Sequence, residues 1–256
     1  MFTSFEEIFE HLRSKSKKRL VAAWAVGDHT INAVRLAIEL GIVEGTLVGD
    51  ENMINAVCKE EGIDPSIFNI VHNESELKSI AQAVDIINAG EGDILMKGLC
   101  STDKYMRAIL KKEGGLLPPK AVLSHLSVLK NENYHKFIIL GDMAVIPAPD
   151  LKQKEAITNY LVKAAKALGI ETPKVAFIAA TEQMLPGMQA CVDAAILSKM
   201  ADRGQIKGCV ADGPLALDVA ISQEAVAIKK LKSPVAGDAD CLVFPNIESA
   251  NVFYKV

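Results

Sequence analysis

The chain has 256 residues, of which 50% are hydrophobic, and its formal net charge at pH 7 is −4. This length supplies one large domain or two smaller ones with enough apolar material for a core. The acidic balance argues against a nucleic-acid partner and against an anionic membrane surface, and the one basic cluster, residues 15–19, is interpreted as a solvated helix end. No apolar run approaches the roughly 20 residues that a membrane helix needs.

The N-terminus and the cysteines both indicate a cytoplasmic protein. The first residues lack the basic and apolar regions of a signal peptide. The 5 cysteines form no C-x-x-C pair, so neither a disulfide framework nor a zinc site is predicted. Cys209 and Cys241 fall in apolar runs and are interpreted as small buried residues of strands. Cys100 differs, because it lies beside Lys97 in a loop.

Apolar runs of strand type alternate with helical patterns from residue 20 to residue 112. Such alternation predicts a mostly parallel sheet that is covered on both faces. The expected strands are 20–26, 46–49, 68–71 and 93–96, and the expected helices are 29–40, 52–61, 74–89 and 102–112.

The glycine- and proline-rich segment 114–119 interrupts this alternation. Two apolar runs, 122–129 and 137–140, follow with only a polar turn between them, which predicts an antiparallel pair of strands. We therefore expect a first α/β domain at 1–130 and a second at 131–256. In the second, helices are expected at 152–168, 188–200 and 222–231, with a last one beginning near the end of the chain, and strands at 175–179, 206–210 and 242–244.

The first group of candidate site residues is the loop Met96-Lys97-Gly98-Leu99-Cys100-Ser101-Thr102. A strand that ends at Lys97, a glycine for a tight turn and a hydroxyl cap on the next helix form a typical anion site, and Arg107 follows on that helix. The same pattern is often purely structural. The loop lacks the spacing of phosphate-binding P-loops and of dinucleotide-binding turns, so neither ATP nor NAD is predicted.

The second group is Ser124-His125, inside an apolar run. A histidine beside a strand is more often a satisfied core or edge residue than a base. Ser124 is a plausible phosphate donor only if it lies at the cleft end of its strand.

The third group is acidic. Asp212-Gly213-Pro214-Leu215-Ala216-Leu217-Asp218 is predicted to be a turn between apolar strands. Together with Asp142 and Glu182, its two aspartates would place four carboxylates at strand ends, along one wall of a cleft. Alternatively, Asp212 and Asp218 cap helices and stabilise turns.

Five segments, taken in order, form a recognisable series: Leu95–Leu99, Ser124-His125, Ser198–Val210, Asp212–Asp218 and Gly237–Lys255. Their order and spacing resemble those of the phosphate acetyl/butyryltransferase (phosphotransacylase) family, and of the butyryltransferase branch most closely. The resemblance implies two α/β domains with mostly parallel sheets, similar to isopropylmalate dehydrogenase, and a cleft between the domains.

The resemblance also implies a reaction, in which acyl-CoA and inorganic phosphate give acyl phosphate and free coenzyme A by direct transfer. Coenzyme A is then a substrate, with no cofactor and no metal, and the enzyme is a homodimer or larger. Arg107 matches an arginine expected to carry phosphate or coenzyme A charge, Lys97 and Ser124 would assist at the phosphate, and the Asp212–Asp218 loop would shape the cleft floor. Gly98, His125, Asp142, Glu182 and Gly213 complete the predicted binding set.

One departure from the family pattern leaves alternatives open. Relatives are expected to continue past the Asn251-x-x-Tyr254-Lys255 word into a strand and a helix with a Ser-Arg pair and a downstream acid, which this sequence does not contain. The alternative is therefore a catalytically silent relative that binds coenzyme A or phosphate. An oxidoreductase on the same fold is a third reading, but it needs an arginine cluster that is absent.

Overall fold

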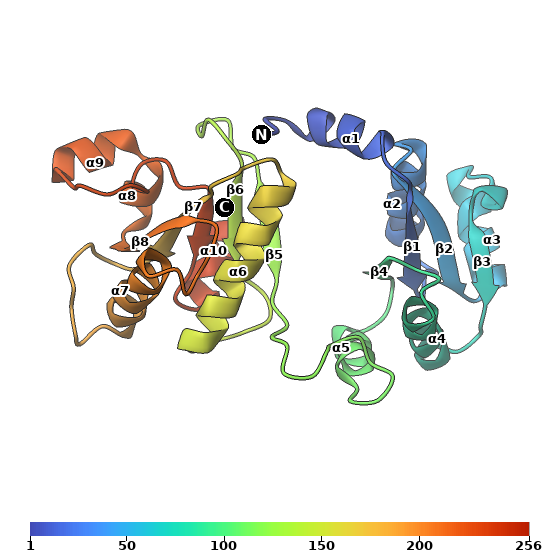
Figure 1. Ribbon diagram of the computed structural model, residues 1–256. Helices are drawn as coiled ribbons and strands as arrows, with labels where there is room; N and C mark the ends of the chain where they lie inside the picture. The colour runs from blue at the N-terminus through green and yellow to red at the C-terminus, as the bar shows by residue number, and fades with distance from the viewer. Residues whose placement is uncertain (256) are drawn as a thin grey trace. The chain divides into compact units, whose positions relative to one another are not determined.

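The computed structural model describes residues 1–255, which form two compact units (Figure 1). The N-terminal unit is Phe5–Ala121, and the C-terminal unit is Met1–Ser4 with the chain from Val122 onward. The two units divide between Ala121 and Val122, before the predicted boundary at 130/131, and there is a physical reason for this. Strand β5 (Leu126–Leu129) is hydrogen-bonded to β6 (Ile138–Gly141), so a boundary at 130 would separate the two strands of one hairpin.

The N-terminal unit contains a four-stranded parallel sheet in the order β3-β2-β1-β4. Its strands are β1 (Lys18–Ala23), β2 (Val43–Gly49), β3 (Asn69–His72) and β4 (Ile94–Lys97). Its helices are α1 (Phe5–Arg13), α2 (Asp28–Glu39), α3 (Glu51–Glu61), α4 (Glu76–Asn88) and α5 (Thr102–Leu110), with a 3₁₀ turn at Pro65–Ile67.

Alternating residues of β1 separate the two layers of this core. Leu20 and Ala22 pack with residues of α2 and α3, whereas Val21 and Ala23 pack with residues of α4 and α5. The predicted alternation of strands and helices is confirmed here. Helix α1 was not predicted, although its apolar residues Phe5, Ile8 and Phe9 recur at helical spacing and its first turn is acidic.

The C-terminal unit contains a five-stranded sheet in the order β5-β6-β9-β7-β8. The predicted antiparallel pair is confirmed in β5 and β6, and the remaining pairings are parallel. The other strands are β7 (Lys174–Ile178), β8 (Val210–Leu215) and β9 (Cys241–Val243). The helices are α6 (Leu151–Ala167), α7 (Gln189–Asp202), α8 (Leu217–Ile221), α9 (Gln223–Lys229) and α10 (Ile247–Lys255).

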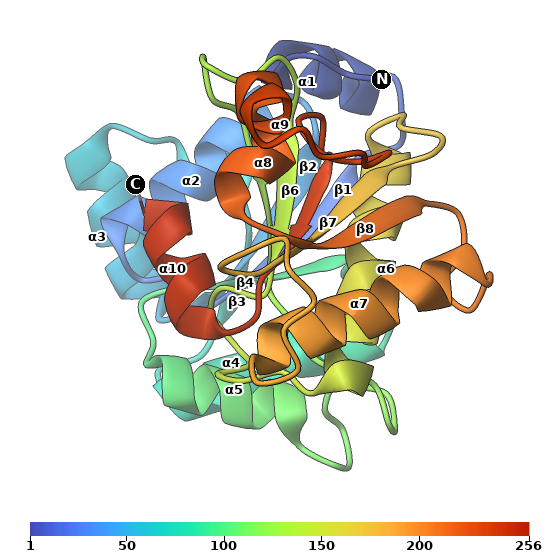
Figure 2. The same ribbon diagram turned by 90° about the vertical axis from the view of Figure 1, so that its left-hand side faces the viewer.

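Two apolar clusters cover the two faces of this sheet. Ile139 packs with residues of α6 and α7, while Ile138 and Leu140 pack with residues of α8 and α10. Figure 2 shows α6 and α7 along the same side of the sheet. The loops that follow β6, β7 and β9 lead into α6, α7 and α10 at one edge of the sheet, where the carboxyl ends of these strands lie.

The structure corrects two predictions in this unit. Asp212-Gly213-Pro214-Leu215 is not a turn but the last four residues of β8, and the strand expected at 206–210 begins only at Val210. Proline fits because β8 is an edge strand and because two residues, Gly213 and Pro214, stand opposite one residue of β7 in a bulge. The single helix expected at 222–231 is also interrupted, since Ser222 caps α9 after α8 has ended.

Candidate functional site

The turn after β4 lies against the end of β1 so closely that only glycine fits at position 98. The backbone N–H groups of Gly98 and Leu99 donate to the carbonyl oxygens of Ala23 and Trp24, each at 3.0 Å. A Cβ atom on Gly98 would lie 2.4 Å from the Trp24 carbonyl oxygen and 2.6 Å from that of Ala23. Lys97 is exposed at the carboxyl end of β4. Among residues 1–255, its Nζ has a hydrogen bond only to the Gly98 carbonyl oxygen, at 3.4 Å.

The predicted hydroxyl cap on the following helix is Ser101, whose side chain accepts from the Lys104 N–H at 3.2 Å. Lys104 pairs with Glu76, which also accepts from the Ser101 N–H at 3.3 Å. Cys100 is buried, and this burial raises the pKa of its thiol despite the nearby Lys97. The turn therefore presents one exposed cation, Lys97, and a thiol that stays protonated at neutral pH.

Arg107 lies in the last turn of α5 and is largely exposed. Its side chain is 79% exposed, and its Nε is 2.9 Å from an oxygen of Asp103, one helical turn earlier. An exposed ion pair of this kind contributes little to stability. The guanidinium is therefore available to an anionic ligand at little cost in folding free energy.

Ser124 and His125 were predicted to lie inside a strand. In the structure they lie directly before β5. The reason is Asp142, which is 2% exposed and accepts the His125 N–H at 3.2 Å in place of a ladder bond. Because β5 runs antiparallel to β6, this arrangement brings Ser124 and His125 to the carboxyl end of β6. The His125 Nδ1 contacts the sulfur of Met143, and its ring meets that of Tyr254 edge to face, with centroids 6.3 Å apart.

Asp142 is occupied by the backbone around it. Its Oδ1 accepts the N–H groups of Ala144 at 2.7 Å and Val145 at 2.9 Å, and its Oδ2 accepts that of His125. A buried carboxylate with three N–H donors stabilises the loop that it closes. Its position at the carboxyl end of β6 agrees with the prediction, but its oxygens face this backbone.

Glu182 and Asp218 are brought together by Lys229, which sequence reasoning missed. The Lys229 Nζ lies 3.1 Å from Glu182 and 3.2 Å from Asp218. The hydrogen bond to Glu182 is the main cause of a raised Lys229 pKa. Desolvation acts to raise the pKa of the Asp218 carboxyl, but the hydrogen bond from Lys229 and those from backbone N–H groups outweigh it, so that this pKa is lowered. No local signal connects Lys229 to Glu182.

Asp212 and Gly213 lie within β8. The Asp212 carboxylate accepts the N–H of Gly213 at 2.8 Å. A Cβ on Gly213 would lie 2.7 Å from the Phe177 Cβ and 2.8 Å from the Phe177 carbonyl oxygen, so glycine is required for packing against β7. Gly213 thus has a structural role that the turn prediction did not include.

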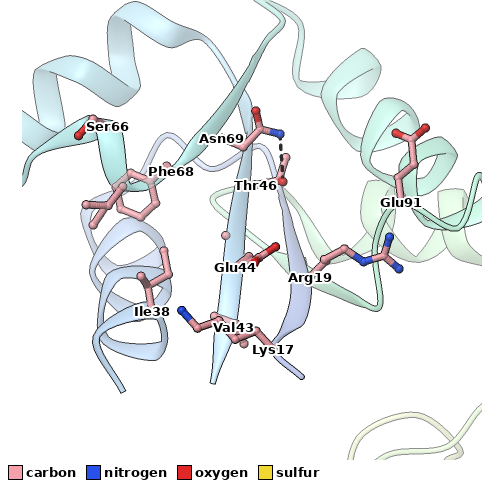
Figure 3. A pocket seen from close by; sticks show the side chains of 12 residues that line it. Lys17, Arg19, Ile38, Val43, Glu44, Thr46, Ser66, Phe68, Asn69 and Glu91 are labelled. Carbon is pink, nitrogen blue, oxygen red and sulfur yellow. Dashed lines mark hydrogen bonds between the residues drawn. The ribbon is translucent and has the colours of Figure 1, made fainter. Parts of the chain in front are cut away.

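A hollow of about 480 Å³ lies in the N-terminal unit, at the edge of its sheet where the amino ends of the strands lie (Figure 3). It is lined by residues at the amino ends of the strands, including Arg19, Val43 and Asn69, and Asn69 donates to the Thr46 hydroxyl at 3.3 Å. None of the predicted site residues lines it. Ligands of parallel sheets bind at the carboxyl ends of strands, so this hollow is not the candidate site.

Among residues 1–255, no group of three or more His, Cys, Asp or Glu side chains is arranged to hold a metal ion. Nor does any helix in that range have the length and apolar character needed to cross a membrane.

Known proteins resemble the chain over almost its whole length. It is 44% identical over 255 residues to a phosphate butyryltransferase of Clostridium acetobutylicum, covering 100% of this chain and 84% of the relative. It is 40% identical to a phosphate acetyltransferase of Thermotoga maritima, covering 98% and 84%. The sequence profile described as "Phosphate acetyl/butaryl transferase" matches residues 73–256. The chain belongs to the phosphate acetyl/butaryl transferase family.

Solved structures agree with this family assignment. A branched-chain phosphotransacylase from Enterococcus faecalis superposes with a TM-score of 0.81 at 28% identity, covering 93% of this chain and 83% of that one. A phosphotransacetylase from Streptococcus pyogenes gives 0.80 at 20% identity, covering 98% and 85%, which supports the fold alone. The expected two-domain α/β fold of the phosphotransacylases is therefore confirmed for this family member.

Proposed function

We propose that this chain is a phosphate acyltransferase that exchanges phosphate and coenzyme A on a short-chain acyl group. In this reaction butyryl-CoA and inorganic phosphate give butyryl phosphate and coenzyme A. The observation that carries the proposal is the 44% identity to a phosphate butyryltransferase over 100% of the chain. The catalytically silent alternative is not favoured, because the full-length relatives are named as transferases.

Direct transfer is part of the proposal. A phosphate oxygen attacks the thioester carbonyl, the carbon–sulfur bond breaks, and the departing thiolate takes up a proton to give free coenzyme A. Charge develops on the carbonyl oxygen and on sulfur, which cations and N–H donors stabilise. Cys100 is unsuited to a covalent route, because it is buried and burial raises the pKa of its thiol.

We assign the anionic parts of the substrates to the cations at the β4–α5 turn. Lys97 and Arg107 are both exposed, and neither is held by a buried partner. Ser124 and His125 at the end of β6 would contribute a hydroxyl and a ring nitrogen. Asp142, Glu182, Asp212 and Asp218 would then act by shaping loops, since each already accepts hydrogen bonds from the protein. The cleft between the domains remains a prediction.

The test is phosphate-dependent release of free coenzyme A, measured with a thiol reagent on butyryl-CoA and acetyl-CoA. The proposal expects release that requires phosphate and the accumulation of acyl phosphate, trapped as a hydroxamate. A folded protein that releases no coenzyme A from either thioester contradicts it. The ratio of kcat/KM for the two thioesters then identifies the preferred chain length.

Two accompanying expectations are also proposals. A homodimer or larger assembly is testable by light scattering of the purified protein, and a single-chain mass would contradict it. A cytoplasmic location follows from the chemistry, because coenzyme A thioesters and acyl phosphates are intracellular metabolites. Fractionation of cells that express the protein tests it.

A further inference from the structure

A second hollow, of about 590 Å³, lies in the C-terminal unit, between the starts of α6 and α7 and the loop after β9. We call it the α6–α7 hollow and define it by Leu151, Gln189, Ala190, Ile196, Pro245 and Asn246. All of these residues follow the carboxyl ends of β6, β7 or β9, the edge at which parallel sheets bind ligands. Its volume falls within the roughly 300–1,000 Å³ typical of small-molecule sites.

The α6–α7 hollow has an apolar wall that the described chain leaves open. Leu151, Ala190 and Pro245 line it, and Ile196 beside them is 42% exposed. Burial of such a surface against an apolar part of a ligand is favourable by about 25 cal/mol per Å².

The α6–α7 hollow carries no free positive charge. Lys154 reaches its wall, but this lysine is 5% exposed and its Nζ is held by Asp193 at 2.5 Å. Asp150, the only other charged residue on the wall, is an acid. Phosphate groups therefore find no free cation there and would meet a carboxylate, so the hollow suits an uncharged segment of a ligand.

Two side-chain amides of the α6–α7 hollow each have one polar atom without a hydrogen-bond partner among residues 1–255. Gln189 donates through Nε2 to Asp193 at 2.7 Å, which leaves its Oε1 as an acceptor. Asn246 accepts through Oδ1 from the Ser249 N–H at 3.0 Å and hydroxyl at 2.8 Å, which leaves its Nδ2 as a donor. One acceptor and one donor are the complement of a peptide-like amide.

We propose that the α6–α7 hollow binds the pantetheine arm of coenzyme A, and this inference rests on the proposed acyltransferase function. The arm is uncharged, carries two amides and has an apolar dimethyl group. These features match the lack of a free cation, the two free amide atoms and the apolar wall. A butyryl chain has no amide and would leave Gln189 and Asn246 unpaired. The nucleotide phosphates would lie outside the hollow, because it offers them no free cation.

The test uses Ala190→Phe, which fills the hollow, and Ala167→Phe as a matched control at the far end of α6. We expect Ala190→Phe to raise the KM for butyryl-CoA about tenfold while the KM for phosphate changes less than about twofold. Pantetheine alone should inhibit the wild type competitively against butyryl-CoA and should inhibit Ala190→Phe about tenfold more weakly. If the Ala190→Phe and Ala167→Phe proteins have the same KM for butyryl-CoA and the same inhibition constant for pantetheine, the proposal is overturned.

Direct binding of coenzyme A by calorimetry separates failure of the inference from failure of the function. Wild-type binding that Ala190→Phe weakens about tenfold supports the α6–α7 hollow even in a protein without turnover. If the enzyme turns over and Ala190→Phe binds coenzyme A with the same affinity as Ala167→Phe, the proposed function stands and the α6–α7 hollow is rejected as the pantetheine site. If Ala190→Phe fails to fold, Ile196→Trp at the partly exposed wall and Gln189→Leu, which removes the free acceptor, are expected to give the same selective loss.

Discussion

The carboxyl edges of the two sheets differ in what their charged residues are free to do. In the N-terminal unit, Lys97 and Arg107 are exposed, and a glycine that nothing else can replace shapes their turn. In the C-terminal unit, the buried Asp142 accepts three backbone N–H groups, and Glu182 and Asp218 share Lys229. Acidic side chains at strand ends can thus be structural even where cations at another strand end are available to a ligand.

Gly98→Ala should have the largest effect. The new methyl group would lie 2.4 Å from a carbonyl oxygen of β1, so the turn must move away from the strand. We expect the free energy of unfolding to fall by about 3 kcal/mol or more and kcat/KM to fall at least about 100-fold. Urea denaturation and steady-state kinetics measure both. Gly187→Ala, where a Cβ meets nothing within 4 Å, is the matched control. Unchanged stability in Gly98→Ala would contradict the close approach.

Asp142→Ala should come second, with an effect on stability. Removal of the buried carboxylate leaves three N–H groups without their acceptor and costs about 2 kcal/mol in the free energy of unfolding. Asp142→Asn keeps one acceptor oxygen and should lose less. Asp202→Ala removes an exposed carboxylate and serves as the control. A stable Asp142→Ala protein without turnover would show instead that this acid acts on the substrate.

Arg107→Ala should lower activity without lowering stability. Loss of an exposed guanidinium that stabilises substrate charge should reduce kcat/KM about 100-fold. The free energy of unfolding should stay within about 0.5 kcal/mol of the wild-type value, because the Asp103 pair is exposed. Lys111→Ala, just after the same helix, is the control. Wild-type kinetics in Arg107→Ala would remove this arginine from the site.

Lys229→Met should cause the smallest change in stability, and the size of this change should depend on pH. The folded-state pKa of Asp218 is lowered, so this carboxylate adds stability above its unfolded pKa of about 3.9, and that stability is lost as the pH falls through the folded value. The pKa of Lys229 is raised, so its contribution is lost only as the pH rises beyond about 10.4. The urea midpoint of the variant should be slightly lower at pH 7 and should converge with that of the wild type at acidic pH. A constant difference across the acidic range would contradict the ion pair.

The local parts of the structure could be predicted from the sequence. The antiparallel pair has a polar turn between two apolar runs, and the Ser101 cap follows a strand and a glycine. The Asp212–Leu215 segment shows where such local reasoning fails. Glycine and proline are typical of turns, but an edge strand with a bulge accepts both, and only the order of the strands in the sheet reveals that β8 is at an edge.

The candidate site was less predictable, because the state of its acids depends on distant partners. His125 donates to Asp142 across 17 positions, and Lys229 reaches Glu182 across 47. Nothing near Asp142 or Glu182 in the sequence shows that these oxygens are occupied. The positions of Lys97 at a strand end and of Gly98 in a tight turn could be predicted, because both depend on the local sequence alone.

The end of β1 also offers an optical reporter of the candidate turn. Trp24 is the only tryptophan of the sequence, it is partly buried, and its carbonyl oxygen accepts the Leu99 N–H at 3.0 Å. Any rearrangement of the Lys97–Ser101 turn changes the surroundings of this one indole. Its emission should therefore follow occupancy of the turn in stopped-flow mixing with phosphate, without a dye and without background from another fluorophore of the same kind.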